Sequence, residues 1–304
     1  MDILDMKNYM KAAAVLMLTI AVVCTACKKD PEQGSFTAPT GAIDAKFTVN
    51  ASGGKVFFSK GNLQYDKTTK KWSFMDHQYD LVESNGQEVG ENYENQNIVS
   101  LFCWGTSGYA HGAECYQPYS TVTNTSDYYA YGNSSYSLFD QTGQADWGYN
   151  AISNGGNKTN LWRTLTKEEM EYVFNGRSTT SGMRYAKSCV NNANGVILLP
   201  DDWDSSVFTL NNTDSETAVF NSNIITASQW STLEQHGAVF LPAAGWRNVI
   251  LVAGVGVSGN YWSSSCCDYG LIGGLHFCDA ESDLSVKDYY RCYGFSVRLV
   301  SDAQ

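Results

Sequence analysis

Short apolar or alternating runs, separated by polar and glycine-rich segments, dominate the chain from residue 46 onward. Runs of this length and pattern predict β-strands rather than helices. Residues 76–150 show few helix signals, and their Trp and Tyr residues predict long ordered loops instead of disorder. The predicted strands are Lys46–Asn50, Lys55–Lys60, Gly61–Tyr65, Lys71–Phe74, Gly195–Pro200, Ala238–Leu241, Asn260–Ser265, Gly274–Cys278 and Phe295–Val300.

Two segments carry helical signals. Thr166 followed by Glu169 has the sequence of a capping box, in which a hydroxyl and a carboxylate each satisfy an unpaired amide at a helix start. Apolar residues on one face follow, and Gly176 ends this helix. Ala227–Gln235 predicts a second short helix. Because strands surround two helices without strand–helix–strand alternation, the predicted class is α+β with antiparallel strands.

The first 44 residues differ in composition from the rest of the chain. Two lysines precede the apolar run Ala12–Val23, which is too short to span a bilayer and is typical of an export signal. Small residues then precede Cys27, as in a bacterial lipobox, where the cysteine is lipidated; an ordinary cleaved signal is the alternative. We therefore predict a signal peptide over 1–26, a lipid anchor at Cys27 and a flexible tether over 27–44.

The charge of the chain excludes one class of partner. Its formal net charge is −11 at pH 7, so phosphate groups would be repelled and nucleic acid is not expected as a partner. The chain has 19 Tyr and 27 Gly, a composition that suits recognition surfaces and is also common in exported β-rich proteins.

The cysteines leave several possibilities open. An exported chain permits disulfides, but the sequence does not determine which of the seven cysteines beyond Cys27 would pair. Cys266, Cys267, His276 and Cys278 are residue types that bind zinc, although their spacing matches no standard zinc motif. Disulfides and free thiols are the alternatives, and we predict no metal and no cofactor. The seven are Cys103, Cys115, Cys189, Cys266, Cys267, Cys278 and Cys292.

Few residues suit catalysis. His111 with Cys115 is the best pair for nucleophilic chemistry, and a structural loop histidine is the alternative. Gly254–Gly259 spells G-x-G-x-x-G, but strand-like residues follow it where a dinucleotide site requires a helix. The acidic segment Asp201–Asp204 lacks the spacing of an EF-hand calcium loop, so a capped turn is the alternative. The sequence therefore predicts that the chain is not an enzyme.

Seven segments, three in the last third of the chain and four upstream, carry a family resemblance. They resemble Bacteroidetes surface lipoproteins of C-type-lectin-like fold and the variable proteins of diversity-generating retroelements. The resemblance implies one C-type-lectin-like domain over 45–304, held at the outer membrane on the cell surface by its lipid. The segments are Gly61–Tyr65, Trp104–Gly108, Trp162–Thr166, Arg184–Lys187, Leu241–Arg247, Gly259–Ser265 and Tyr293–Val300.

The resemblance also implies a variable region over about 246–298. In the retroelement group a reverse transcriptase alters template adenines, and the altered codons cluster on the binding face. Asn codons of the AAY type can then yield only a restricted set of residues. Asn248–Asn260 and Cys266–Ala280 contain only members of that set, whereas a naturally irregular Gly- and Cys-rich loop is the alternative. The expected variable inserts are Asn248–Ser258 and Cys266–Cys292.

The predicted function is binding of a protein or glycan ligand on another cell or on a host surface, with the variable region setting specificity. An enzyme of formylglycine-generating type on the same fold, and a fimbrial or surface-matrix component, remain alternatives. Trp246, Trp262 and Arg298 are expected to support the frame. The expected contact residues are Val249, Leu251, Ala253, Cys266, Cys267, Asp268, Tyr269, Leu271, Gly274, His276, Cys278, Asp288, Tyr289, Tyr290 and Cys292.

Overall fold

A computed structural model describes most of the chain beyond residue 36. The predicted signal peptide, Cys27 and residues 27–36 of the tether lie outside the described residues, as do His111, Asp268 and Tyr269. No helix within the described part is long and apolar enough to cross a membrane. The described residues are 37–90, 96–109, 114–130, 133, 135–138, 144–267, 270–279 and 284–303.

The packed domain begins before residue 45, where the predicted tether ends. Ala42 forms a β-bridge with Ser59, and the backbone N–H of Ile43 donates to the carbonyl of Phe58 at 2.8 Å. The side chain of Ile43 is buried among core residues. The last residues assigned to the tether are therefore part of the domain.

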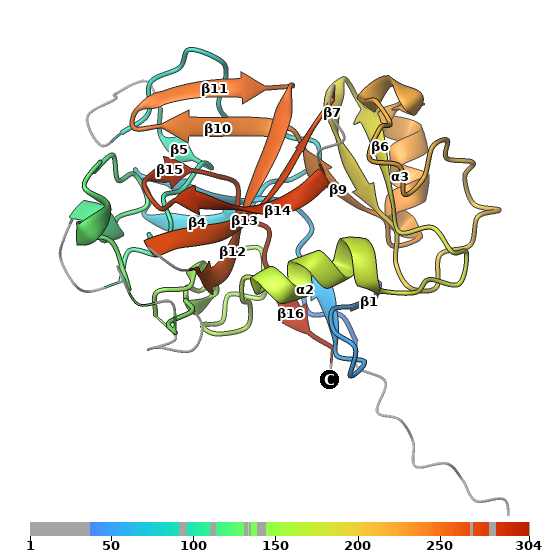
Figure 1. The fold of residues 1–304 in the computed structure, drawn as a ribbon, viewed down its shortest axis with the longest axis horizontal. Coiled ribbons are helices and arrows are strands. Elements are labelled where there is room, and N and C mark those ends of the chain that lie inside the picture. Colours follow the sequence, from blue (N-terminus) through green and yellow to red (C-terminus); the bar gives the residue numbers. More distant parts are fainter. Residues whose placement is uncertain are drawn as a thin grey trace, which may run out of the picture. The chain divides into compact units, whose positions relative to one another are not determined.

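Strands dominate the described chain and most pair antiparallel, which confirms the α+β class (Figure 1). The strands are β1 (Phe47–Thr48), β2 (Lys55–Phe58), β3 (Leu63–Asp66), β4 (Lys71–Phe74), β5 (Ile98–Val99), β6 (Tyr185–Val190), β7 (Ala193–Leu198), β8 (Ile224–Ile225), β9 (Val239–Pro242), β10 (Ala244–Asn248), β11 (Leu251–Val255), β12 (Ser258–Cys266), β13 (Leu271–Cys278), β14 (Leu284–Tyr290), β15 (Tyr293–Gly294) and β16 (Val300–Asp302). The largest sheet has the order β11-β10-β12-β13-β14, with β15 also paired to β10. Smaller sheets have the orders β1-β2-β16, β4-β3-β5 and β8-β6-β7-β9.

The last predicted strand, Phe295–Val300, is wrong as a continuous strand. Regular pairing stops at Gly294 and resumes at Val300. Between them the backbone makes single contacts with other strands instead: the carbonyl of Val297 accepts from the amide of Leu63 in β3 at 2.9 Å, and Ser296 forms an isolated bridge with Tyr261 in β12. An alternating sequence does not distinguish these two ways of satisfying the backbone.

The two segments predicted as irregular inserts are also wrong in that respect, because both are rich in strands. Asn248–Ser258 contains the tight turn between β10 and β11, then β11 itself. Cys266–Cys292 contains β13 and β14. Glycine and cysteine weaken the strand signal of these segments, and pairing with neighbouring strands supplies what the local pattern lacks.

Both predicted helices are confirmed. Helix α2 (Lys167–Glu171) begins after Thr166, and both hydrogen bonds of the capping box with Glu169 are present. A π-helical turn, η4 (Tyr172–Gly176), continues it. Helix α3 (Ala227–Gln235) has its own capping box at Thr226, which sequence reasoning missed. Single 3-10 turns are η1 (Glu114–Tyr116), η2 (Thr125–Asp127), η3 (Trp147–Tyr149) and η5 (Phe220–Ser222).

The strands β12, β13 and β14 separate two parts of the core. Side chains alternate between the faces of a strand, so Tyr261 and Trp262 enter different clusters. Helix α2 contacts one face of these strands (Figure 1). On that face Tyr261 and Phe277 belong to the same core cluster as Met170 of α2. Trp262 packs on the other face with Phe295. That second face carries the site described below.

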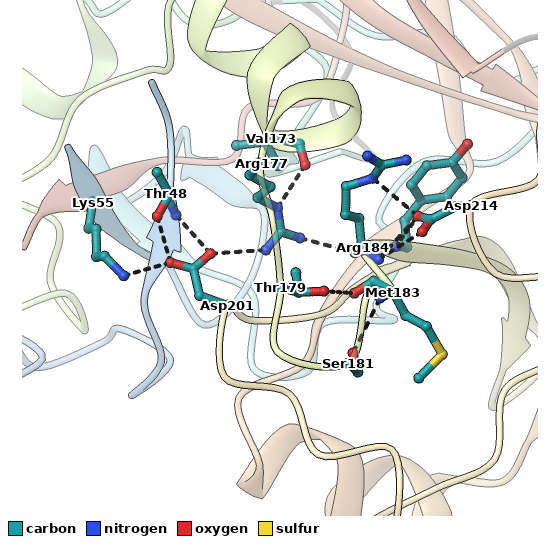
Figure 2. A network of polar contacts seen from close by, with 11 residues as sticks. Thr48, Lys55, Val173, Arg177, Thr179, Ser181, Met183, Arg184, Asp201 and Asp214 are labelled. Carbon is teal, nitrogen blue, oxygen red and sulfur yellow. Dashed lines mark hydrogen bonds and ion pairs between the residues drawn. The ribbon is translucent and has the colours of Figure 1, made fainter. Parts of the chain in front are cut away.

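A buried polar network joins η4 to the strands β1 and β2 (Figure 2). The Asp201 carboxylate accepts hydrogen bonds from the backbone of Thr48 at 3.0 Å, the Thr48 hydroxyl at 2.7 Å, Lys55 Nζ at 2.9 Å and Arg177 Nη1 at 3.3 Å. Burial acts to raise the pKa of Asp201, but the bonds from Thr48 and Lys55 outweigh it and hold the pKa below its usual range. Cationic and neutral hydrogen-bond donors thus surround the Asp201 carboxylate, which links β1, β2 and Arg177.

Arg177 is the buried member of this network. Its guanidinium donates to the carbonyl of Val173 at 2.7 Å and to that of Arg184 at 3.0 Å. It also lies 5.1 Å from the ring centroid of Phe47. Burial lowers the pKa of Arg177 to about 10, which leaves it charged at neutral pH.

Glu83 provides a test of a buried carboxylate. It accepts from the backbone of Ser100 at 2.7 Å and of Leu101 at 3.3 Å, yet burial raises its pKa. A raised pKa in the folded state contributes stability below the unfolded pKa, and this stability is lost as pH rises through the folded pKa. Glutamine does not titrate. As pH rises between the unfolded and the folded pKa of Glu83, we therefore expect the free energy of unfolding of Glu83→Gln to increase relative to wild type by at most about 1.4 kcal/mol per pH unit. Urea unfolding between pH 4.5 and 8 measures this, and parallel stability curves would contradict it.

Candidate functional site

The predicted contact residues that the structure describes lie on strands and turns of the largest sheet, but they differ in solvent exposure. Leu251, Asp288 and Tyr290 are exposed. Cys266 and Gly274 are buried, which contradicts a direct contact role for them. The remaining members are half-buried: Val249, Ala253, Cys267, Leu271, His276, Cys278, Tyr289 and Cys292.

Packing explains the two corrections. Cys266 belongs to the core cluster of Trp262, and its sulfur lies 3.3 Å from a guanidinium nitrogen of Arg291. A Cβ placed on Gly274 would lie 3.2 Å from the ring of Tyr289, so this glycine is covered by its neighbour. Composition suggested both as surface positions, and only the strand register shows that they face inward.

Cys267 and Asp288 lie beside Lys167 of α2. Lys167 Nζ is 2.9 Å from Asp288 Oδ1 and 3.8 Å from Cys267 Sγ. Burial, with the neighbouring Asp288 carboxylate, raises the pKa of Cys267 to about 11. The thiol is therefore protonated at neutral pH and is a poor nucleophile.

The strand β11 presents Leu251 at a covered edge of the sheet. The amide of Val252 donates to the carbonyl of Gln87 at 2.9 Å, and the amide of Gly86 donates to the carbonyl of Val252 at 2.9 Å. Glu88 bridges Leu251 itself. The loop over residues 86–89 thus occupies the edge and leaves the 48 % exposed Leu251 side chain facing outward.

Val249 occupies a backbone conformation that its side chain disfavours. Its φ is +53°, at the turn that closes the Asn248–Leu251 pair. A β-branched residue in the left-handed region is strained by about 1–2 kcal/mol, and Gly or Asn is the usual choice there.

We therefore expect Val249→Asn to raise the free energy of unfolding by about 1 kcal/mol, because Asn tolerates positive φ. Thermal and urea unfolding of the two chains measure the difference. Ile250→Asn, at the neighbouring turn position, is the control and should give no gain. An equal gain from both substitutions would show that polarity, rather than backbone strain, is responsible.

A pocket of about 160 Å³ opens on the face of β12–β14 that is turned away from α2. Four aromatic rings and three polar side chains line it, contributed by β10, β12, β13, β14, β15 and the residue after β15. The lining residues are Trp246, Ser258, Asn260, His276, Tyr289, Tyr293 and Phe295.

The polar side of the pocket has a defined orientation. Asn260 Nδ2 donates to the carbonyl of Gly245 at 3.1 Å and to Ser258 Oγ at 3.3 Å. A carbonyl can only accept, so the amide oxygen of Asn260 faces the opposite way, 2.9 Å from His276 Nδ1. His276 must therefore carry its proton on Nδ1. The ring is held in one orientation beside the pocket.

The aromatic walls support one another. Trp246 meets Tyr293 edge-on with centroids 5.3 Å apart, and Tyr289 meets Phe295 edge-on at 4.9 Å. Phe295 in turn stacks on the buried Trp262 at 4.2 Å. The walls are thus anchored to the core and hold the pocket open.

Only His276 and Tyr289 of this pocket were predicted as contacts. Trp246, predicted to support the frame, forms a wall instead. Asn260, Tyr293 and Phe295 were missed because they belong to segments predicted as regular frame. Ser258, the last residue of a predicted insert, was not among the expected contacts. Alternation along β12 places Ser258 and Asn260 on one face, but their neighbours across the sheet depend on register. The other two residues expected in the frame, Trp262 and Arg298, are buried.

Two buried arginines fasten the ends of the predicted inserts. Arg247 donates to the carbonyl of Leu101 at 3.2 Å and to the carbonyl of Val249. Arg291 donates to the carbonyl of Gly270 at 2.8 Å and 3.0 Å. Each guanidinium therefore holds an insert through its main chain.

The candidate zinc residues are separated along one hairpin. Cys266 pairs with Ile272, whereas His276 pairs with Asn260 and Cys278 with Ser258. Ile272, opposite Cys266, and Cys278 are six residue steps apart along β13, which corresponds to roughly 20 Å. This is far more than a zinc site spans. Within the described residues, no group of three His, Cys, Asp or Glu side chains is placed to hold a metal ion.

The seven cysteines in the described chain are free thiols. Cys115, the candidate nucleophile, is buried, and its sulfur lies 2.9 Å from the carbonyl of Asp127. Burial raises its pKa, so it is not an activated thiolate.

Comparison of the chain with protein-family models, with curated proteins and with solved structures found no match in any of the three.

Proposed function

We propose that this chain is a surface-displayed binding protein with a C-type-lectin-like domain, anchored at the outer membrane through Cys27. Its binding surface is the sheet β10–β15, and its specificity is set by side chains of the variable region, as in the retroelement proteins it resembles. One observation carries the proposal: an aromatic pocket and the exposed residues Leu251 and Tyr290 come from the segment expected to vary. Concave, mostly apolar sites with a few oriented polar groups are typical of ligand binding.

The strain at Val249 supports the same function. A turn selected for stability would carry Gly or Asn at a φ of +53°, and this chain carries valine. Residues held in disfavoured conformations cluster at functional sites. A residue choice made without regard to local stability is what codon diversification produces.

A protein partner fits this surface better than a glycan. Leu251 is 48 % exposed and Tyr290 is 56 % exposed, so large apolar groups face solvent around the pocket. Aromatic anchors next to pockets dominate the binding energy of protein interfaces. No carboxylate pair or metal group at the pocket suggests a catalytic alternative within the described residues.

The test is a binding array of host and bacterial surface proteins and glycans, probed with wild type and with a Leu251→Ala, Tyr290→Ala double variant. We expect the affinity of the variant for its partner to fall by at least about tenfold, the usual effect of truncating interface anchors. Ile224→Ala is the matched control, because Ile224 is 72 % exposed on β8, in a different sheet. Unchanged binding by the double variant would place the binding surface elsewhere.

A further inference from the structure

We propose that the pocket beside β12–β14 receives a phenolic ring, which on the proposed binding function is a tyrosine side chain of the partner. The pocket volume of about 160 Å³ accommodates one six-membered ring. A protein cavity of about 150 Å³ binds benzene, so the sizes agree. The pocket is too small for two rings and larger than a water site.

The walls suit the faces of such a ring. The rings of Trp246, Tyr293, Phe295 and Tyr289 form one continuous series, with successive centroids 5.3 Å, 6.2 Å and 4.9 Å apart. A ring packed against them adds offset or edge-on contacts, which aromatic groups favour. Because these rings are packed on one another and Phe295 is anchored on Trp262, they are in place before a ligand arrives.

The polar side of the pocket offers few hydrogen bonds. The amide of Asn260 is used at both ends, since it donates to Gly245 and Ser258 and accepts from His276. The Ser258 hydroxyl accepts from Asn260, so its own proton is directed to another acceptor. Apart from the hydroxyls of the wall residues Tyr289 and Tyr293, this leaves the polar side one hydroxyl donor, Ser258, beside an oriented imidazole, which matches the single hydroxyl of a phenol.

The same count argues against the other ligand classes. A hexopyranose carries about five hydroxyls, and burying them without partners is costly. A cation would require a carboxylate or a fully aromatic cage, whereas the lining combines three neutral or imidazole side chains with four rings and contains no carboxylate. Phenylalanine would fill the walls but would leave the Ser258 hydroxyl without the acceptor that a phenol oxygen supplies.

The experiment titrates the full chain with four probes and follows the indole signal of Trp246 by NMR. The probes are N-acetyl-tyrosinamide, N-acetyl-phenylalaninamide, p-cresol and methyl α-glucoside. We expect the tyrosine probe to bind at least about fivefold more tightly than the phenylalanine probe, from the hydroxyl contact. We expect the glucoside to show no saturable shift.

Variants separate the walls from the polar side. Tyr289→Ala should weaken the tyrosine probe by about tenfold or more, since it removes a wall. Ser258→Ala should leave the affinity for the phenylalanine probe unchanged. It should reduce the affinity for the tyrosine probe to a similar value. Ile224→Ala, in another sheet, should change neither.

Each outcome bears on the ligand class. Equal binding of the tyrosine and phenylalanine probes to wild type, no binding of these two probes or of p-cresol, or tighter binding of the glucoside would overturn the phenol assignment. Binding of p-cresol without the tyrosine probe would support a phenolic ligand and identify it as a free small molecule. Loss of partner binding in the Leu251 and Tyr290 variant tests the proposed function separately, so either proposal can fail alone.

Discussion

Replacing Arg177 with methionine should lower the free energy of unfolding by about 3 kcal/mol, because it removes one partner of a buried ion pair. The loss includes the bond to Asp201, the bond to the carbonyl of Val173 and the contact with the Phe47 ring. Asp201 keeps its bonds from Thr48, which limits the loss to the lower end of the usual range. Guanidinium unfolding followed by circular dichroism measures it.

Arg184→Met is the matched control in the same network (Figure 2). Arg184 pairs with Asp214 at 3.4 Å, and both side chains are partly exposed, so the loss should be about 1 kcal/mol or less. Equal losses from the two substitutions would show that burial of Arg177 does not matter. Acid adds a second check. The pKa of Asp201 is lowered in the folded chain. Its carboxylate therefore contributes to the free energy of unfolding above the unfolded pKa, and this contribution is lost as pH falls through the folded pKa.

Arg291→Met should lower the free energy of unfolding by about 3 kcal/mol and also weaken partner binding. Arg291 is buried, lies 5.3 Å from the ring centroid of Trp104, and donates to the carbonyls of Gly270 and Tyr129. Its removal leaves buried carbonyls without donors and frees the backbone next to Cys266. Urea unfolding and the binding array measure the two effects.

Tyr290→Ala is the control for this second result, because Tyr290 is adjacent in sequence but 56 % exposed. Its free energy of unfolding should change by less than about 0.5 kcal/mol, as at most surface positions. Its binding should fall. A loss of stability in Tyr290→Ala as large as in Arg291→Met would remove the distinction between frame and contact residues.

Local signals in the sequence were sufficient for the helices and for part of the strands, whereas β5, β6, β8, β10, β11, β14 and β15 had no predicted counterpart. Thr166 and Glu169 form a capping box whose two hydrogen bonds involve residues three apart, so the sequence alone contains the needed information. The class followed from the same signals. The strand β14 and the first residues of β13 were missed because their support comes from pairing across the sheet, which local residue choice does not report.

The pocket could not be predicted for a related reason. His276 and Asn260 are 16 residues apart and meet only because β12 and β13 pair in one particular register. A shift of β13 by one residue would turn His276 to the α2 face, away from Asn260. The same dependence hid the burial of Gly274, which lies under Tyr289 on the next strand.

The arginine contacts at the insert ends have an evolutionary consequence. Arg247 and Arg291 donate hydrogen bonds to backbone carbonyl oxygens. Every residue type has the same backbone carbonyl, whatever its side chain. A side-chain change at position 249 therefore leaves the hydrogen bond from Arg247 chemically intact. Surface side chains of such a chain can change while the hydrogen bonds from arginine to the backbone carbonyls remain. Tolerance to mutation then depends on the backbone rather than on the side chains.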